Sequence, residues 1–125
     1  MDKKRIKRIE SELKKEISVM INTELKNPNI APITSITEIN LTDDLQSAKI
    51  FVSVFGKDYE KRDTIEALQQ SIGYIKRELG KRMKLRHIPD LTIILDEHIE
   101  EAMRLEKLIS DVIKKDNEAI NEREE

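Results

Sequence analysis

The chain has 125 residues, enough for one domain. Only 3% are aromatic, so its core must be aliphatic, and this composition argues against an aromatic platform for stacking RNA bases. The absence of cysteine excludes disulfides, thiolate metal sites and thiol nucleophiles, and no apolar run reaches the roughly 18 residues of a membrane span. Charged residues reach 38%, well above the usual quarter, yet the net charge is only −2.

The N-terminal segment has the pattern of a long amphipathic helix. From Asp2 to Lys26, apolar residues recur at steps of three and four, which predicts a helix with one buried face. Asn27-Pro28 is expected to end it, because proline disfavours helical geometry in the residue before it. The apolar stripe consists of Ile6, Ile9, Leu13, Ile17, Met20 and Leu25, widened by Ile21.

Two β-strands are predicted next. Residues 33–41 are rich in Ile and Thr, and residues 47–55 read Ser-Ala-Lys-Ile-Phe-Val-Ser-Val-Phe. The polar segment between them contains Asp43 and Asp44, whose side chains can bond to their own backbone in a turn. The two runs and this turn predict an antiparallel hairpin.

A second helical pattern passes through Gly73. The stripe from Ile65 to Met83 keeps helical spacing on both sides of that glycine, which costs a helix about 1 kcal/mol relative to alanine. We interpret Ser71-Ile72-Gly73 as a kink between two helices on the same sheet, since serine and glycine are common at kinks. Residues 91–95 predict a buried third strand, and Asp96 is expected to cap a last helix.

The element order predicts an α+β fold. It runs α-β-β-α-kink-α-β-α, which is compatible with a three-stranded sheet covered on one face by helices. We expect one domain, residues 1–115, followed by a charged, disordered tail, residues 116–125.

The near-neutral total charge hides two basic blocks. Residues 1–15 carry +4 and residues 73–95 another +4, whereas residues 96–125 carry −6. In the second block the cations lie opposite the apolar stripe, and acidic residues spaced to neutralise them are missing, which favours a polyanionic partner over a merely solvated face. The predicted RNA contacts are Lys76, Arg77, Lys81, Arg82, Lys84 and Arg86, with Lys3, Lys4, Arg5 and Arg8 as a second patch.

Nothing in the sequence indicates catalysis, a metal or a cofactor. His87 lies among basic residues, which disfavours its protonated form, and His98 has no second ligand at metal-binding spacing. The acidic residues that begin at Asp96 suit a helix N-terminus better than a cation site. The serines lack a histidine base, and three glycines do not make a phosphate loop, so we expect no enzyme.

The chain resembles bacterial ribosome-binding factor A over about residues 3–115. The matching segments are individually weak, but their order and spacing together are specific. They are Arg5-Ile6, Arg8-Ile9, Leu25-Lys26-Asn27-Pro28, residues 48–54, residues 71–79 and residues 85–91. The resemblance implies a type II KH-like fold in which an Ala-X-Gly helix-kink-helix replaces the usual GxxG nucleic-acid loop. Here that triplet is Ser71-Ile72-Gly73, with serine in place of alanine.

The resemblance also implies a function. It is that of a non-catalytic RNA chaperone that binds the precursor of the small (30S) ribosomal subunit and assists late maturation of 16S rRNA, in association with growth in the cold. The implied partners are 16S rRNA, the free 30S subunit and a ribosome-associated GTPase, and we expect a cytoplasmic monomer without a membrane partner. Two alternatives stay open: another KH-like RNA-binding protein, or a protein-interaction adapter that uses its acidic C-terminal helix.

Overall fold

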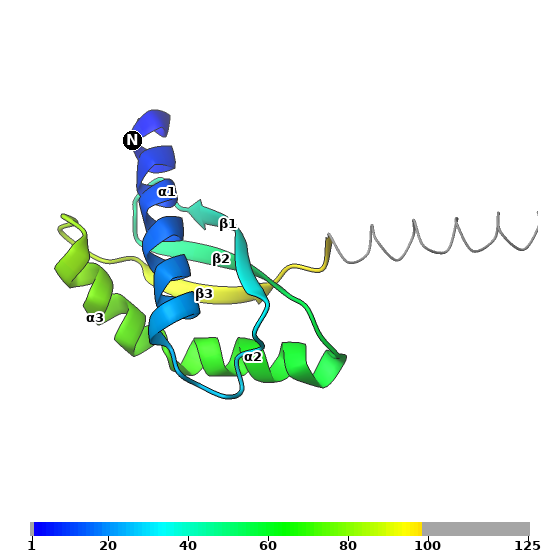
Figure 1. Ribbon diagram of the computed structural model, residues 1–125. Helices are drawn as coiled ribbons and strands as arrows, with labels where there is room; N and C mark the ends of the chain where they lie inside the picture. Colours follow the sequence, from blue (N-terminus) through cyan, green and yellow to red (C-terminus); the bar gives the residue numbers. More distant parts are fainter. Residues whose placement is uncertain (1, 99–125) are drawn as a thin grey trace, which may run out of the picture.

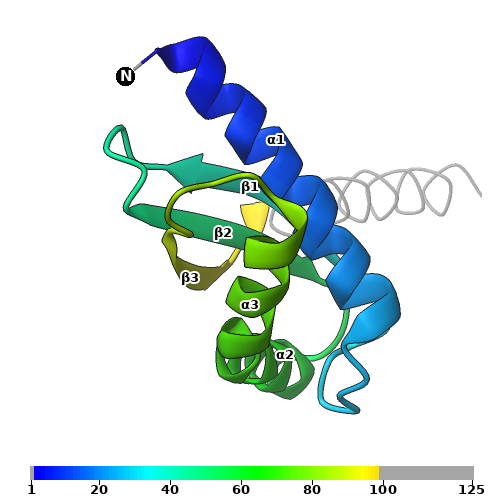
Figure 2. The same cartoon turned by 90° about the vertical axis from the view of Figure 1, so that its left-hand side faces the viewer.

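A computed structural model describes residues 2–98 of the chain, in which helices cover one face of a three-stranded sheet (Figures 1 and 2). The predicted α+β class and the order of elements as far as the third strand are confirmed. The helix predicted after Asp96 lies outside the described residues from position 99 onward, and so does the tail at residues 116–125. The elements are α1 (Lys3–Val19), the π-helical turn η1 (Met20–Glu24), β1 (Thr34–Leu41), β2 (Ser47–Val54), α2 (Asp58–Gln70), α3 (Ile72–Arg82) and β3 (Asp90–Leu95).

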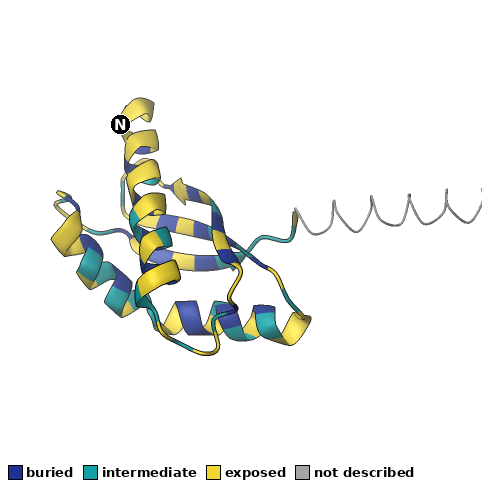
Figure 3. Cartoon of the chain, in the orientation of Figure 1, coloured by how far each residue is buried: buried dark blue, intermediate teal, exposed yellow. Residues whose placement is uncertain are grey.

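The sheet has the order β1-β2-β3, with β2 in the centre. β1 and β2 form the predicted antiparallel hairpin, and β3 adds to β2 in parallel. The register aligns Ile39, Ile50 and Ile93 across the three strands, and all three side chains are buried. Because side chains alternate along a strand, this row fixes which face of the sheet the helices cover, as the buried bands in Figure 3 show.

The first helix ends earlier and more loosely than the sequence predicts. Its last turn is π-helical, with the Leu25 N–H donating to the Met20 carbonyl at 2.8 Å, and it stops at Glu24 instead of Lys26. Met20 and Ile21 of this turn are both buried in the core, as the apolar stripe predicts.

The segment between η1 and β1 is held to α2 by Thr64. This side chain is fully buried, and its hydroxyl accepts a hydrogen bond from the Ala31 N–H at 2.9 Å. The same hydroxyl donates to the Asn29 carbonyl at 3.2 Å. A buried threonine thus satisfies two backbone groups that belong to no helix or strand.

The break between α2 and α3 lies at Ser71, two residues before the glycine on which the sequence centred it. Ser71 leaves regular helical geometry (φ −87°, ψ 0°), and its hydroxyl donates to the Ala67 carbonyl at 2.9 Å. Such back-bonding to the preceding turn bends helices. Gly73 is an exposed residue of α3, and a methyl group added there would meet no atom within 4 Å.

The end of β3 is tied to an irregularity in β1. The register between β1 and β2 shifts at Thr37, and the Thr37 hydroxyl donates to Asp96 Oδ2 at 2.6 Å. Asp96 Oδ1 accepts the His98 N–H at 3.0 Å. The Thr37 bond, followed by those from His98, lowers the pKa of Asp96 to about 2.

Thr64→Val should reduce stability, because the variant keeps the shape of the side chain but leaves the Ala31 N–H and the Asn29 carbonyl without their partner. We expect a loss of about 1–3 kcal/mol in the free energy of unfolding, measured by urea denaturation. Thr64→Ser, which keeps the hydroxyl and loses one methyl group, is the matched control and should cost only about 1 kcal/mol. A valine variant as stable as the parent would show that these bonds contribute nothing.

Asp96→Asn should remove a pH-dependent part of the stability. The pKa of Asp96 is lower in the folded protein than its ordinary value of 3.8, so its contribution is present above that value and disappears as the pH falls towards 2. The stability difference between parent and variant should therefore shrink between about pH 4 and pH 2. Chemical denaturation at several pH values measures it, and a difference independent of pH would contradict the assignment.

Candidate nucleic-acid interface

The predicted cations of the second basic block lie on α3 and on the segment that leads from it to β3. Ile75 and Leu79 of α3 are fully buried, which turns the opposite side of the helix outward (Figure 3). Arg77, Lys81, Lys84 and Arg86 are exposed.

The prediction that this face lacks neutralising acids is wrong for part of it. Lys76 pairs with Asp90 at 3.0 Å, and Glu78 pairs with Lys81 at 3.6 Å and with Arg82 at 3.2 Å. Glu78 is at the i,i+4 spacing to Arg82 and could have been recognised from the sequence. Asp90 could not, because the chain after α3 must fold back to bring the start of β3 to Lys76.

Arg82 is engaged by side chains of the protein itself. Both terminal N–H groups of its guanidinium donate to the carboxylate of Glu24 in η1, with the Nη1–Oε2 bond at 2.8 Å, and the Tyr74 hydroxyl donates to the same carboxylate at 3.1 Å. The bond to Arg82 lowers the pKa of Glu24, and the carboxylate in turn raises the pKa of Arg82. Burial, then the bond to Glu24, raises the pKa of Tyr74. A bidentate pair of this kind holds α3 against the end of the first helix.

The other cations keep their charge available. Within residues 2–98, Arg77, Lys84 and Arg86 form no ion pair, and neither do the N-terminal residues Lys3, Lys4, Arg5 and Arg8. Asp2 accepts the Lys4 N–H at 3.0 Å and so caps α1 at the helix end that carries this second patch.

The two basic blocks meet in the folded chain. Arg5 from the first turn of α1 and Lys84, Arg86 and His87 from the segment after α3 line one cleft of about 190 Å³. Residues 44–46 of the turn between β1 and β2 also line this cleft. Figure 2 shows these three segments at the same end of the molecule. From the sequence we expected two separate patches and did not include the turn residues Leu45 and Gln46. An apolar residue inside a polar turn was a signal of a binding site there.

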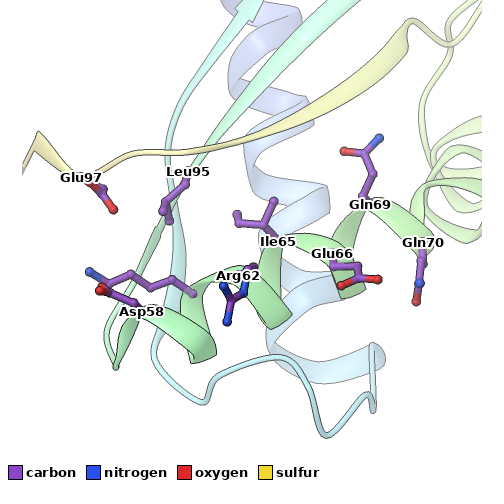
Figure 4. Close-up of a pocket in the computed structure, with 9 residues that line it drawn as sticks. Asp58, Arg62, Ile65, Glu66, Gln69, Gln70, Leu95 and Glu97 are labelled. Atoms are coloured by element: carbon purple, nitrogen blue, oxygen red, sulfur yellow. The ribbon is translucent and has the colours of Figure 1, made fainter.

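A larger cavity, of about 740 Å³, lies between α2 and the chain at the end of β3 (Figure 4). Its apolar side chains are Ile65 and Leu95. The charged lining consists of Lys61, Arg62, Asp58, Glu66 and Glu97. With three carboxylates against two cations, this lining does not attract a polyanion. No predicted contact residue lies in it.

No metal or membrane feature occurs in the described part of the chain. Residues 2–98 contain no cluster of three His, Asp or Glu side chains that could hold a metal ion. No helix among them is both long and apolar enough to cross a bilayer. His87 is exposed at the rim of the cleft, and His98 Nδ1 lies 2.7 Å from Asp96 Oδ1.

Comparison with known proteins gives one consistent family. The family model of ribosome-binding factor A matches residues 5–109. The chain is 40% identical over 119 residues to ribosome-binding factor A of Clostridium botulinum, covering 95% of this chain and 98% of the relative. It is 45% identical over 107 residues to that of Acetivibrio thermocellus, covering 86% and 87%.

Solved structures agree on the fold. A solution structure of a Thermotoga maritima ribosome binding factor A superposes with a TM-score of 0.68 at 24% identity, covering 80% of this chain and 94% of that one. The crystal structure of the Thermus thermophilus protein gives 0.65 at 19% identity, covering 72% and 93%. A Thermus thermophilus homology model fitted into a cryo-EM map of a 30S complex gives 0.60 at 18% identity, covering 71% and 92%. With the family model spanning most of its length, the chain belongs to the ribosome-binding factor A family.

Proposed function

We propose that this chain binds the precursor of the 30S ribosomal subunit and assists late maturation of 16S rRNA as a non-catalytic RNA chaperone. Its family supports a ribosome-binding role, and a Thermus thermophilus relative has been fitted into a map of a 30S complex. The observation that carries the proposal is the meeting of the two basic blocks, through Arg5, Lys84 and Arg86, at one end of the molecule.

The energetics suit contacts with an RNA backbone. Phosphates displace counterions when they meet cations, so affinity depends on salt in proportion to the number of contacts. Arg5, Arg77, Lys84 and Arg86 form no ion pair within residues 2–98, and these four would give a log–log salt slope near −2.8 on single strands, at about 0.7 per contact. Lys76, Lys81 and Arg82 are left out of this sum, because they pair with carboxylates of the chain.

The mechanism needs no covalent step. A protein that binds an immature rRNA conformation more tightly than the mature one stabilises the immature form by that difference in affinity. Release then follows when maturation removes the favoured conformation, and a ribosome-associated GTPase is the partner proposed to assist it. The proposal includes a cytoplasmic monomer that acts during growth in the cold.

A second candidate function is a protein-interaction adapter. It would use the acidic segment from Asp96 onward, where carboxylates outnumber cations, to dock a basic partner.

Sedimentation of cell extract tests the proposed function directly. The protein should travel with free 30S particles and be absent from 70S ribosomes. The double variant Arg77→Glu/Lys81→Glu should lose this association, because the reversed charges repel phosphates. The control Lys49→Glu/Lys57→Glu reverses as many exposed charges elsewhere, on the uncovered sheet face and before α2, and should keep it.

Other outcomes would contradict the proposal. Cofractionation with 70S ribosomes, or with no ribosomal particle, would rule out the assignment. If the Arg77/Lys81 variant still binds and removal of residues 98–125 abolishes binding, the adapter function is correct instead.

The variants Arg77→Ala and Arg82→Ala should separate binding from stability. Arg77 is exposed and forms no ion pair within residues 2–98, so its loss should change the free energy of unfolding by less than about 0.5 kcal/mol and reduce the salt slope by about 0.7. Loss of Arg82 removes the guanidinium that is bonded to Glu24, so it should lower the melting temperature and leave the salt slope unchanged. An Arg82 variant of parental stability with a smaller slope would mean that this guanidinium contacts RNA.

A further inference from the structure

The cleft where the two basic blocks meet has an apolar interior and a charged rim. Ile9 of α1, Leu41 at the end of β1 and Pro89 before β3 are buried and form its floor. Leu45 and Leu85 are half-buried and form its walls. The exposed rim carries Arg5, Lys84 and Arg86.

We propose that this cleft holds one unstacked nucleotide of the bound RNA. The base would lie between Leu45 and Leu85, and its phosphates would contact Arg5, Lys84 and Arg86. The inference rests on the proposed RNA binding and adds to it a place where a base, in addition to the backbone, is held. A planar apolar face joined to an anion is the ligand chemistry that an aliphatic cleft with a cationic rim selects.

The wall formed by Leu45 is built at a conformational cost. Leu45 has φ 62°, the left-handed region that a bulky residue rarely adopts. The turn holds it there: the Leu45 N–H donates to the Thr42 carbonyl at 2.9 Å, and Asp44 Oδ1 accepts the Gln46 N–H at 3.0 Å. Strained residues that their surroundings hold in place cluster at binding sites. Here the strain presents an aliphatic side chain inside a turn that is otherwise polar.

The charges around the cleft favour a phosphate. Asp44 is the carboxylate of the lining, and it is already engaged by the Thr42 hydroxyl at 2.6 Å and by the Gln46 N–H, which lower its pKa. Three guanidinium or ammonium groups therefore face one internally bonded carboxylate. Among the described residues that line this cleft, His87 supplies the aromatic ring, and it lies exposed at the rim, so a base between Leu45 and Leu85 would meet aliphatic walls.

The test uses the full chain and an oligoadenylate of about ten nucleotides with 2-aminopurine near its centre. Free in solution, this fluorescent base is quenched by stacking on its neighbours. Insertion between Leu45 and Leu85 should raise its fluorescence, since these aliphatic side chains do not replace the stack. Anisotropy of a dye at the end of the RNA reports binding separately.

Leu45→Asn is the diagnostic variant, because asparagine tolerates the left-handed conformation and removes the apolar wall. It should still bind the RNA, through the phosphate contacts, and lose the rise in 2-aminopurine fluorescence. Arg77→Ala, on α3 and outside the cleft lining, is the matched control: it should bind more weakly but keep the full rise once the RNA is saturated.

A measurement on the unmodified protein guards against a misfolded variant. The methyl resonances of Leu45 and Leu85 should shift upfield when the RNA is added, and no such shift should follow addition of inorganic phosphate. RNA binding without a fluorescence rise or a methyl shift, or an unchanged rise in Leu45→Asn, would overturn the inference and leave the proposed function intact. Failure to bind either RNA or 30S particles would overturn both.

Discussion

All three α-helices bury their apolar sides against one face of the sheet, and the positions of the charged groups follow from that packing. The row Ile39, Ile50 and Ile93 defines the face, and burial of aliphatic surface is the main source of stability in a chain with so few aromatic residues. A single straight helix after β2 could not cover the sheet and also reach α1. The break at Ser71 lets α2 pack on β2 and β3 while α3 contacts α1.

The same packing divides the cations into two groups. Lys76 and Arg82 face carboxylates that the fold brings to them, Asp90 and Glu24, and they help to hold α3 in place. Arg77 and the cations near the cleft have no such partner within residues 2–98 and remain a source of positive potential. Net charge conceals this division, because what attracts a polyanion is the charge that the protein does not neutralise itself.

The turn between β1 and β2 breaks a local preference that the rest of the chain obeys. A glycine or asparagine would adopt the conformation of Leu45 at lower cost, so its leucine is consistent with a requirement for an apolar side chain at the cleft. The turn lies beside both basic blocks because β1 ends, and the chain re-enters at β3, at the end of the sheet where α1 begins. A base site here would complement the backbone contacts, which position RNA without reading it.

The sequence by itself determined the elements and the fold class. Helical spacing, strand alternation and turn residues are local, so the two helices around Ser71, the hairpin and the third strand could all be predicted. It also located the basic blocks, but it did not show which of their cations pair with carboxylates of the protein. Only the tertiary structure decided that Glu24 pairs with Arg82 and that Thr37 donates a hydrogen bond to Asp96. It also decided that Arg5, Lys84 and Arg86 line one cleft together with Leu45. The physical reason is that these contacts join residues far apart in the chain, and their approach depends on strand order, register and the bend at Ser71, which no local pattern encodes.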